Sequence, residues 1–376
     1  MTMIISHLFL QHYWWLIVSL LAGILVFLMF VQGGQTMIFS LPKSDIQKTM
    51  IINALGRKWE FTFTTLVTFG GAFFASFPLF YATSFGGAYW VWITILFSFI
   101  IQAVAYEFRS KPNNVFGQKT FDLFLIINGS LGPFLIGTAV ATFFTGSQFS
   151  LNRFNQVQWA TPYYGLEALL NIRNLALGFA VLFLARINGL LYIMNTVDDA
   201  ELKTRSDKKL ILNSIPFLLF FLFFVTSLLF STGLTYDAVT GIVVTEKFKY
   251  FHNFVQMPTV STLFLAGVVW VLYGIGITLF GKSTKGIWYS GAGTIITVFS
   301  LFLYAGFNQT SFYPSSFDLQ SSLTIMNASS SLFTLKTMMY VSFIIPCVIG
   351  YIWYAWKAVN NTKITEEEMN MEGHKY

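Results

Sequence analysis

Three carboxylates stand at the ends of long uncharged segments. Glu60 precedes one apolar segment and Glu107 follows the next, and every residue from Phe61 to Ala105 is uncharged. Asp122 lies near the start of a further apolar segment. A carboxylate in a partly desolvated site has a raised pKa and can transfer protons near neutral pH. The three acids therefore predict a proton-entry cluster.

The same acids also have a purely structural interpretation. Glu60 and Asp122 could complement the dipoles at helix N-termini. Glu107 could pair with Arg109 or Lys111, which follow it closely. The residues by themselves leave both interpretations open.

Arg186 is the one cation well inside an apolar segment. An ionisable group at membrane depth is costly and is expected to face a protein interior. Asn188 or an acidic group of a partner could satisfy it. Alternatively, its long side chain could extend to the membrane surface.

The histidines argue against a haem held by this chain. Haem iron is commonly bound by axial His or Met, whereas the four histidines fall near an end of the chain, in a loop or in the tail: His7, His12, His252 and His374. Nucleotide-binding, zinc-binding and nucleophile motifs are absent from the sequence. We therefore expect no cofactor or metal bound by this chain alone.

The amino-acid composition distinguishes between a soluble protein and a membrane protein. Of 376 residues, 55% are hydrophobic and 10% charged, and the mean hydropathy is +0.64. Soluble domains carry roughly 25% charged residues, so the chain is predicted to be a polytopic membrane protein. The net charge of +6 comes from cations in loops rather than on one polar face, which argues against nucleic-acid binding. The single Cys347 excludes an intrachain disulfide.

The elements that position these residues are predicted to be about nine membrane helices in an all-α fold, because runs of about 20 apolar residues suffice to span a bilayer. The expected spans are about 9–31, 61–83, 87–108, 121–144, 174–195, 210–232, 258–280, 286–307 and 334–356. A Gly86-Gly87 turn is expected to reverse the chain between the second and third helices, which returns Glu60 and Glu107 to one face. Residues 1–376 form one integral membrane domain in this interpretation. It holds two four-helix bundles (about 9–144 and 174–307), a peripheral ninth helix and a tail at 357–376.

The cations predict the orientation. Sixteen of the 22 lysines and arginines fall in the tail and in the loops after the first, third, fifth and seventh spans, and five fall on the opposite side. Because positive loops stay in the cytoplasm, the N-terminus is expected outside and the C-terminus in the cytoplasm.

Several motifs spread along the chain resemble subunit II of the cytochrome bd quinol oxidases. They include Lys58-Trp59-Glu60, the segment 70–78, Tyr106-Glu107-Phe108-Arg109, Tyr313-Pro314-Ser315-Ser316 and Asn327-Ala328-Ser329. The resemblance implies a haem-free subunit in the bacterial inner membrane, paired as a heterodimer with a subunit I that carries haems b and d. Such a complex oxidises quinol and reduces dioxygen to water in an electrogenic reaction that takes protons from the cytoplasm. It leaves open small accessory subunits and a structural quinone or lipid bound to this chain.

The resemblance also implies roles for single residues. Glu60 and Glu107 stand where the family has aspartates, so both are expected to lie on the proton pathway. Three further family carboxylates are amides here, namely Gln32, Gln35 and Asn327. An amide can bind water but cannot titrate. Polar support is expected from Asp122, Arg109, Gln32, Gln35 and Arg186, and Trp59 is expected at an interface or in packing.

Two alternatives come from other classes of protein. One is a stand-alone secondary transporter in which Arg186 and the Gln32 to Gln35 segment bind a small anionic solute, with Gly33-Gly34 as a helix break. The other is a structural subunit of the oxidase that has no role in proton transfer.

Overall fold

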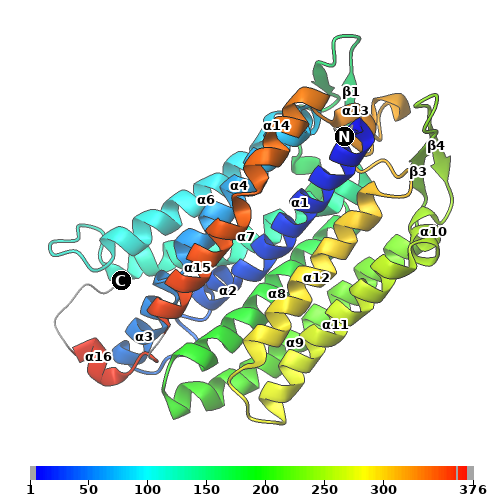
Figure 1. Cartoon of the computed structure of the whole chain (residues 1–376). Helices are drawn as coiled ribbons and strands as arrows, with labels where there is room; N and C mark the ends of the chain where they lie inside the picture. Colours follow the sequence, from blue (N-terminus) through cyan, green and yellow to red (C-terminus); the bar gives the residue numbers. More distant parts are fainter. Residues whose placement is uncertain (1–5, 361–362, 371–376) are drawn as a thin grey trace.

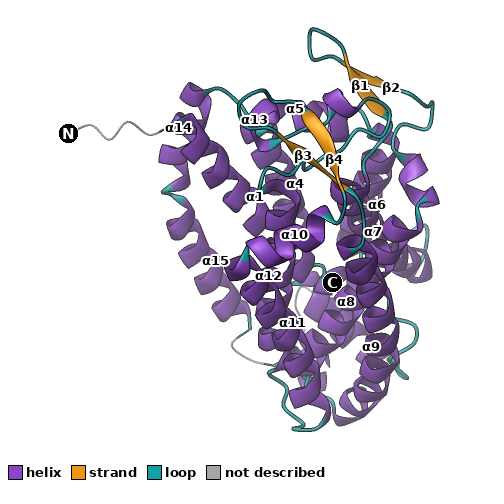
Figure 2. Cartoon of the chain, turned by 90° about the vertical axis from the view of Figure 1, so that its right-hand side faces the viewer, coloured by secondary structure: helices purple, strands orange, loops and turns teal. Residues whose placement is uncertain are grey.

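The computed structural model describes residues 6–360 and 363–370 and consists of long helices packed side by side, with short strands at one end (Figure 1, Figure 2). The long apolar helices are α1 (His7–Leu28), α4 (Trp59–Ser76), α6 (Tyr89–Phe108), α7 (Gln118–Thr145), α8 (Ile172–Thr196), α9 (Ala200–Leu229), α11 (Pro258–Leu279), α12 (Gly286–Gly306) and the consecutive α14 (Leu332–Ser342) and α15 (Ile345–Val359). The shorter helices are α2 (Phe30–Gln35), α3 (Asp45–Gly56), α5 (Pro78–Phe80), the π-helix η1 (Tyr81–Gly86), the 3-10 helices η2 (Leu166–Leu170) and η3 (Leu319–Ser321), α10 (Lys249–Gln256), α13 (Ile325–Ala328) and α16 (Glu366–Asn370). The strands are β1 (Phe149–Leu151), β2 (Val157–Trp159), β3 (Gly233–Tyr236) and β4 (Val243–Glu246). His374 and the tail cation Lys375 lie outside the described residues.

The number of membrane helices agrees with the sequence. Within the described ranges, eight helical segments are long and apolar enough to cross a membrane, and a ninth is formed if the segments Asp45–Ser76 and Pro78–Gly86 count as one span. The prediction of an all-α membrane protein with about nine such helices is confirmed in this form.

The second span differs from the expected straight helix at 61–83. α4 ends at Ser76, and the chain bends by 119° before the segment that begins at Pro78. Pro78 has no backbone N–H and disfavours helical geometry at the preceding residue. Phe77 accordingly has φ −133° and ψ 65°. The chain reversal therefore begins at Phe77, well before the Gly86-Gly87 pair that the sequence suggested.

The long helices pack in two groups that share one core. α1 packs against α4, and α6 against α7; α8 packs against α9, and α11 against α12. The contacts α1 with α12 and α7 with α8 join the groups, while α14 and α15 lie across the outside and are mostly exposed (Figure 1). The peripheral C-terminal helix is thus as predicted.

The short helix α2 is inserted against α7 and α8. Its approach to α8 is so close that a Cβ atom at Gly33 would lie 1.9 Å from the carbonyl oxygen of Ala185. A Cβ at Gly189 would likewise lie 2.4 Å from the backbone nitrogen of Gly34. The Gly33-Gly34 pair therefore serves close helix packing.

The two ends of the bundle differ in structure. At the hairpin end, the antiparallel pairs β1–β2 and β3–β4 lie with α10 and α13 (Figure 2). Isolated bridges join Ser147 to Ser315 and Thr235 to Thr310, so the three long connections at 145–173, 233–257 and 308–333 interlock. At the opposite end, called here the α3 end, α3 packs against α16 (Figure 1).

Candidate functional site: a carboxylate rim and a buried polar column

The chain reversal does bring the start of α4 beside the end of α6. The rings of Trp59 and Tyr106 stack with centroids 5.9 Å apart and planes 16° apart. Glu60 and Glu107, each one residue further along the chain, are both exposed. Glu107 pairs with Lys111 at 3.0 Å, with 57% of its side chain exposed. The two glutamates therefore form an exposed rim at the α3 end, next to a packed aromatic pair.

Asp122 has a different environment from the two glutamates. Its side chain is 1% exposed, and one carboxylate oxygen accepts a hydrogen bond from Nε of Arg109 at 2.7 Å. The other oxygen pairs with the ammonium group of Lys48. Asp122 is the fifth residue of α7, which has no acidic residue in its first turn. It thus balances two cations inside the protein, and the helix-dipole interpretation does not describe it.

A column of polar side chains continues from this ion pair toward the middle of the bundle. The polar column consists of Ser98, Gln102 and Tyr106 on α6, Gln32 and Gln35 on α2, and Asn128 on α7. The α6 members are spaced by four residues and so share one helix face. From Arg109 to Ser98 this face is about 16 Å long at 1.5 Å per residue.

Hydrogen bonds link the column in pairs. Nε2 of Gln35 donates to the hydroxyl oxygen of Tyr106 at 3.0 Å. Nε2 of Gln32 donates to Oε1 of Gln102 at 3.3 Å. Deeper in the bundle, Nδ2 of Asn128 donates to Oγ of Ser98 at 3.3 Å. Ser98, Gln102 and Tyr106 therefore each form a hydrogen bond with a side chain from α2 or α7.

The pairs do not use all the polar atoms of the column. Among the described residues, no hydrogen-bond partner reaches Oε1 of Gln32, Oε1 of Gln35, Nε2 of Gln102 or Oδ1 of Asn128, and all four residues are fully buried. A buried polar atom without a partner is costly, and ordered water is the usual remedy. Three acceptor atoms and one donor atom of the column are therefore available to bind ordered water.

The sequence prediction missed most of the column, because only ionisable groups were considered at membrane depth. Gln32 and Gln35 were named from a resemblance, whereas Ser98, Gln102 and Asn128 were not. The signal was present in the regular spacing of Ser98, Gln102 and Tyr106 within one apolar helix.

Two other predicted residues lie away from the column. Asn327 is at the hairpin end, where it forms a capping box with Thr324 at the start of α13. Arg186 is half-buried, with its Nη2 3.9 Å from Sδ of Met37. Of the alternatives left open for Arg186, Asn188 is not its partner: the Asn188 side chain accepts a hydrogen bond from Ser290 at 2.6 Å, since two residues along a helix correspond to a turn of about 200°.

The histidines of the described residues lie at the hairpin end. A ring nitrogen of His7 is 3.0 Å from the carbonyl oxygen of Ser330, and His12 packs edge-on against Phe307. In the part of the chain that the structure describes, no three His, Cys, Asp or Glu residues come together as a metal site.

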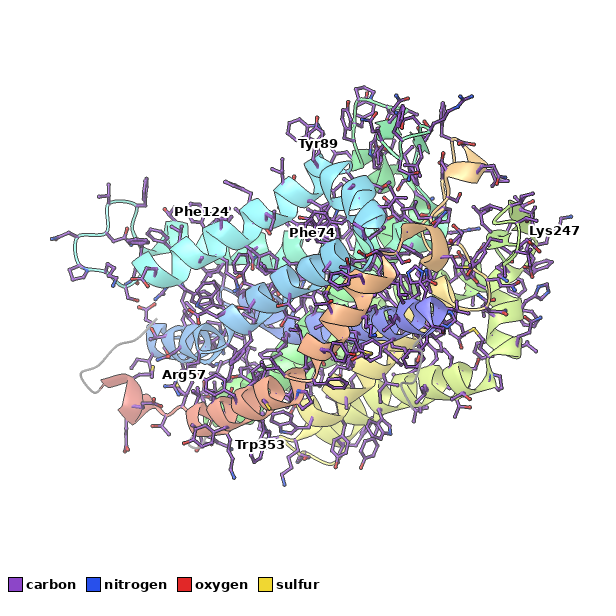
Figure 3. All side chains as sticks on the ribbon, turned by 45° about the horizontal axis from the view of Figure 1, so that its top comes forward. Arg57, Phe74, Tyr89, Phe124, Lys247 and Trp353 are labelled. Atoms are coloured by element: carbon purple, nitrogen blue, oxygen red, sulfur yellow. The ribbon has the colours of Figure 1, made fainter. Side chains whose placement is uncertain are left out.

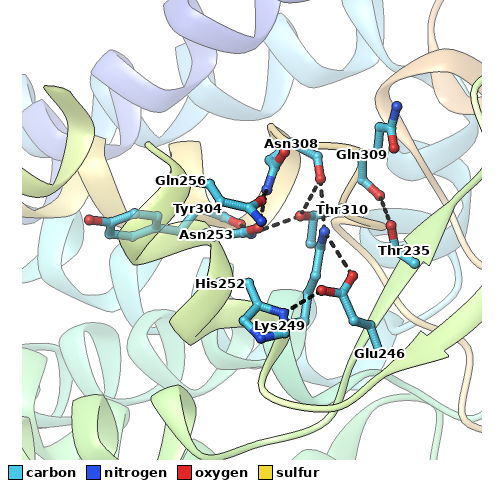
Figure 4. Close-up of polar contacts among 10 residues, drawn as sticks. All are labelled: Thr235, Glu246, Lys249, His252, Asn253, Gln256, Tyr304, Asn308, Gln309 and Thr310. Carbon is cyan, nitrogen blue, oxygen red and sulfur yellow. Dashed lines mark hydrogen bonds and ion pairs between the residues drawn. The ribbon is translucent and has the colours of Figure 1, made fainter. Parts of the chain in front are cut away.

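The hairpin end contains a second polar cluster, around Lys249 (Figure 4). The Lys249 side chain is 5% exposed, and its ammonium group donates to the carbonyl oxygen of Asn308 at 2.9 Å and pairs with Glu246 at 3.1 Å. Nδ1 of His252 lies 2.6 Å from the other Glu246 oxygen. Asn253 donates to Oγ1 of Thr310 at 2.8 Å. This cluster ties β4 and α10 to the connection that follows α12.

Acid should loosen this connection. Partial burial acts to raise the pKa of Glu246, but the hydrogen bonds from His252 and Lys249 outweigh it, so the pKa lies below its ordinary value. A carboxylate with a lowered folded-state pKa contributes stability above its unfolded pKa of about 4.3, and this contribution is lost as pH falls through the folded value. Limited proteolysis of the purified protein at 233–257 should therefore accelerate in that range. In Glu246→Gln, cleavage should already be fast at neutral pH and change little on acidification; a wild-type acid response in this variant would contradict the assignment.

The fold and the site together define a class: a polytopic helical membrane protein with a buried polar column that begins beside a carboxylate rim. The family model for cytochrome bd terminal oxidase subunit II matches residues 10–359, so the chain belongs to this family.

Relatives and a solved structure agree along nearly the whole chain. Cytochrome bd-I ubiquinol oxidase subunit 2 of Escherichia coli (strain K12) is 27% identical over 97% of this chain and 98% of its own length. Cytochrome bd ubiquinol oxidase subunit 2 of Bacillus subtilis (strain 168) is 26% identical over 83% of this chain and 85% of its own length. A chain of the bd oxidase from Geobacillus thermodenitrificans shares the fold, with a TM-score of 0.59 at 11% identity, covering 96% of this chain and 97% of that one. The protein is therefore a membrane subunit of a respiratory terminal oxidase, which argues against the stand-alone transporter.

Proposed function

We propose that this chain is the haem-free subunit of a bd-type quinol oxidase and that its α3 end supplies protons from the cytoplasm for the reduction of dioxygen. Its curated relatives are named subunit 2 of ubiquinol oxidases, which supports a haem-bearing subunit I as partner. The orientation is supported by the cations at the α3 end, which include Lys48, Arg57 and Arg109.

The observation that carries the proton inlet is the series of unsatisfied buried atoms in the polar column. Glu60 and Glu107 are exposed at the rim and can collect protons from bulk water. Amide and hydroxyl groups cannot titrate at neutral pH. The column would therefore act by holding water molecules, along which protons pass toward the partner subunit.

The rim is tested by the double variant Glu60→Gln and Glu107→Gln. Oxygen consumption with quinol is expected to fall on the order of tenfold, because loss of a local negative field reduces the rate of cation capture by about that factor. The haem absorbance per complex should stay at the wild-type value. Glu201→Gln is the matched control, since Glu201 also forms an exposed (i,i+4) ion pair, with Arg205. Unchanged turnover in the double variant would favour the subunit without a proton role.

The column is tested separately by Gln102→Leu. This change removes an amide that accepts from Gln32 and leaves the aromatic pair at the rim intact. Turnover should fall while haem content is retained. Thr278→Val is the control, because the Thr278 hydroxyl is equally buried but donates only within α11, to Gly274. If Gln102→Leu turns over like this control, protons do not use the column.

A further inference from the structure

A groove at the α3 end has the composition of a binding site for an amphipathic ligand. It lies between α8, α12 and α15, next to the last turns of α1, and encloses about 490 Å³. Its apolar wall is formed by Phe27, Trp288, Ile352, Trp353 and Trp356. Tryptophan is enriched where hydrocarbon meets the polar surface of a bilayer. The wall is therefore suited to the upper part of an acyl chain.

The other end of the groove is polar and basic. It is lined by Asn195, Lys357 and Asn360, near the C-termini of α8 and α15. Of the described residues that line the groove, none is acidic. A smaller cavity shares Asn195 and Asn360 and adds the cations Arg57 and Lys363 (Arg57 and Trp353 are labelled in Figure 3).

Some of these cations are already neutralised and others are not. Arg57 pairs with Glu368, and Lys363 lies 3.8 Å from Asp198. Lys357 has no carboxylate partner among the described residues, and its ammonium group lies over the ring of Trp353 at 5.4 Å. The polar end of the groove therefore holds uncompensated positive charge.

Trp356 adds a hydrogen-bond donor to the groove, and the charged side chain of Lys58 lies behind its ring. Its Nε1 is buried and has no acceptor among the described residues. The ammonium group of Lys58, fully buried and likewise without a hydrogen-bond acceptor in the described chain, lies 4.3 Å from the centre of the Trp356 ring. The aromatic wall of the groove thus carries an unpartnered indole N–H, and a buried positive charge lies behind it.

We propose that this groove binds one anionic glycerophospholipid from the leaflet at the α3 end. The phosphate would lie by Lys357 and Asn360, and an acyl chain would follow Trp353 and Trp356 toward Phe27. From Asn360 to Ile349 the lining of α15 extends about 16 Å along the bilayer depth. The charge selects an anionic headgroup over a zwitterionic one, and the site does not depend on the proton inlet.

The test is native mass spectrometry of the intact oxidase complex. The complex is first stripped of lipid with detergent and then titrated with phosphatidylglycerol or phosphatidylcholine. The wild-type protein should retain one phosphatidylglycerol in preference to phosphatidylcholine. Lys357→Gln should weaken this binding about fivefold, the effect of one lysine near an anionic headgroup. Lys119→Gln, an exposed lysine at the same end of the bundle, should have no effect.

A second variant separates the aromatic wall from the charge. Trp353→Leu, on the exposed α15, should weaken binding of both lipids while leaving the preference for phosphatidylglycerol. Equal retention of phosphatidylglycerol by wild type and Lys357→Gln would overturn the proposal. So would equal affinity of wild type for the two lipids, or a stoichiometric quinone that phosphatidylglycerol fails to displace.

Discussion

Replacement of Asp122 by asparagine is expected to remove most of the assembled oxidase from the membrane. The carboxylate of Asp122 is the counter-charge for both Arg109 and Lys48, and the Arg109 side chain is 5% exposed. Removal of one partner from a buried ion pair costs about 3–5 kcal/mol, because an uncompensated charge remains inside. This is a large share of the roughly 5–15 kcal/mol that stabilises a folded protein. The measurement is haem absorbance per milligram of membrane protein, with a native gel for the intact complex.

A second substitution distinguishes charge from shape. Asp122→Asn combined with Arg109→Gln removes the buried cation as well, so part of the lost complex should return. Asp198→Asn is the control, since Asp198 is 66% exposed and its ion pair is 3.8 Å long. Wild-type amounts of complex in Asp122→Asn alone would show that the ion pair contributes little to stability.

Gly33→Ala is expected to have an equally severe effect by a different mechanism. The new methyl group would lie 1.9 Å from the carbonyl oxygen of Ala185 and 2.0 Å from its carbon. Both are backbone atoms of α8, so only a shift of α2 or α8 can relieve the overlap. Overpacking typically costs 1–3 kcal/mol, and because this methyl group overlaps backbone atoms that cannot rotate away, the cost should exceed about 3 kcal/mol.

The predicted result for Gly33→Ala is a thermal midpoint of the purified complex well below that of the wild type, or no complex. Gly276→Ala is the matched control, because a Cβ at Gly276 on α11 meets no atom within 4 Å. If the two variants are equally stable, α2 is not held tightly against α8.

The apolar helices could be predicted from sequence because bilayer thickness fixes the length of a spanning helix. The helices outside the apolar segments could not. α3 was expected to be a loop, yet Ser44 caps it, and Met50, Ile51 and Leu55 are buried. The residues from Ala200 to Lys209 were also assigned to a loop, because they lie outside the apolar segments. They form the first turns of α9, capped by Asp199, since charge does not prevent a helix that projects into water.

The candidate site was predictable only in part, for a related reason. Glu60 and Glu107 were identifiable as charges at the ends of apolar segments. Because the chain reverses between these segments, the two residues could be placed at the same end of the bundle. The burial of Asp122 depends on Lys48, 74 residues away in the numbering, and on Arg109. The pairing of Gln32 with Gln102 likewise depends on the position of α2 between α7 and α8. Such contacts follow from tertiary packing, which local patterns do not specify.

The interlocked connections at the hairpin end set the order in which the molecule can be completed during synthesis. Ser147 hydrogen-bonds to Tyr313, 166 residues later, and the bridge from Ser147 to Ser315 lies beside it. At 5–20 residues per second, the ribosome needs about 8 to 33 s to make the intervening chain. During that interval β1 and β2 lack their final neighbours from the last long connection. A membrane chaperone or the partner subunit has this interval in which to act. The interval ends only when the last long connection, residues 308–333, reaches the hairpin end.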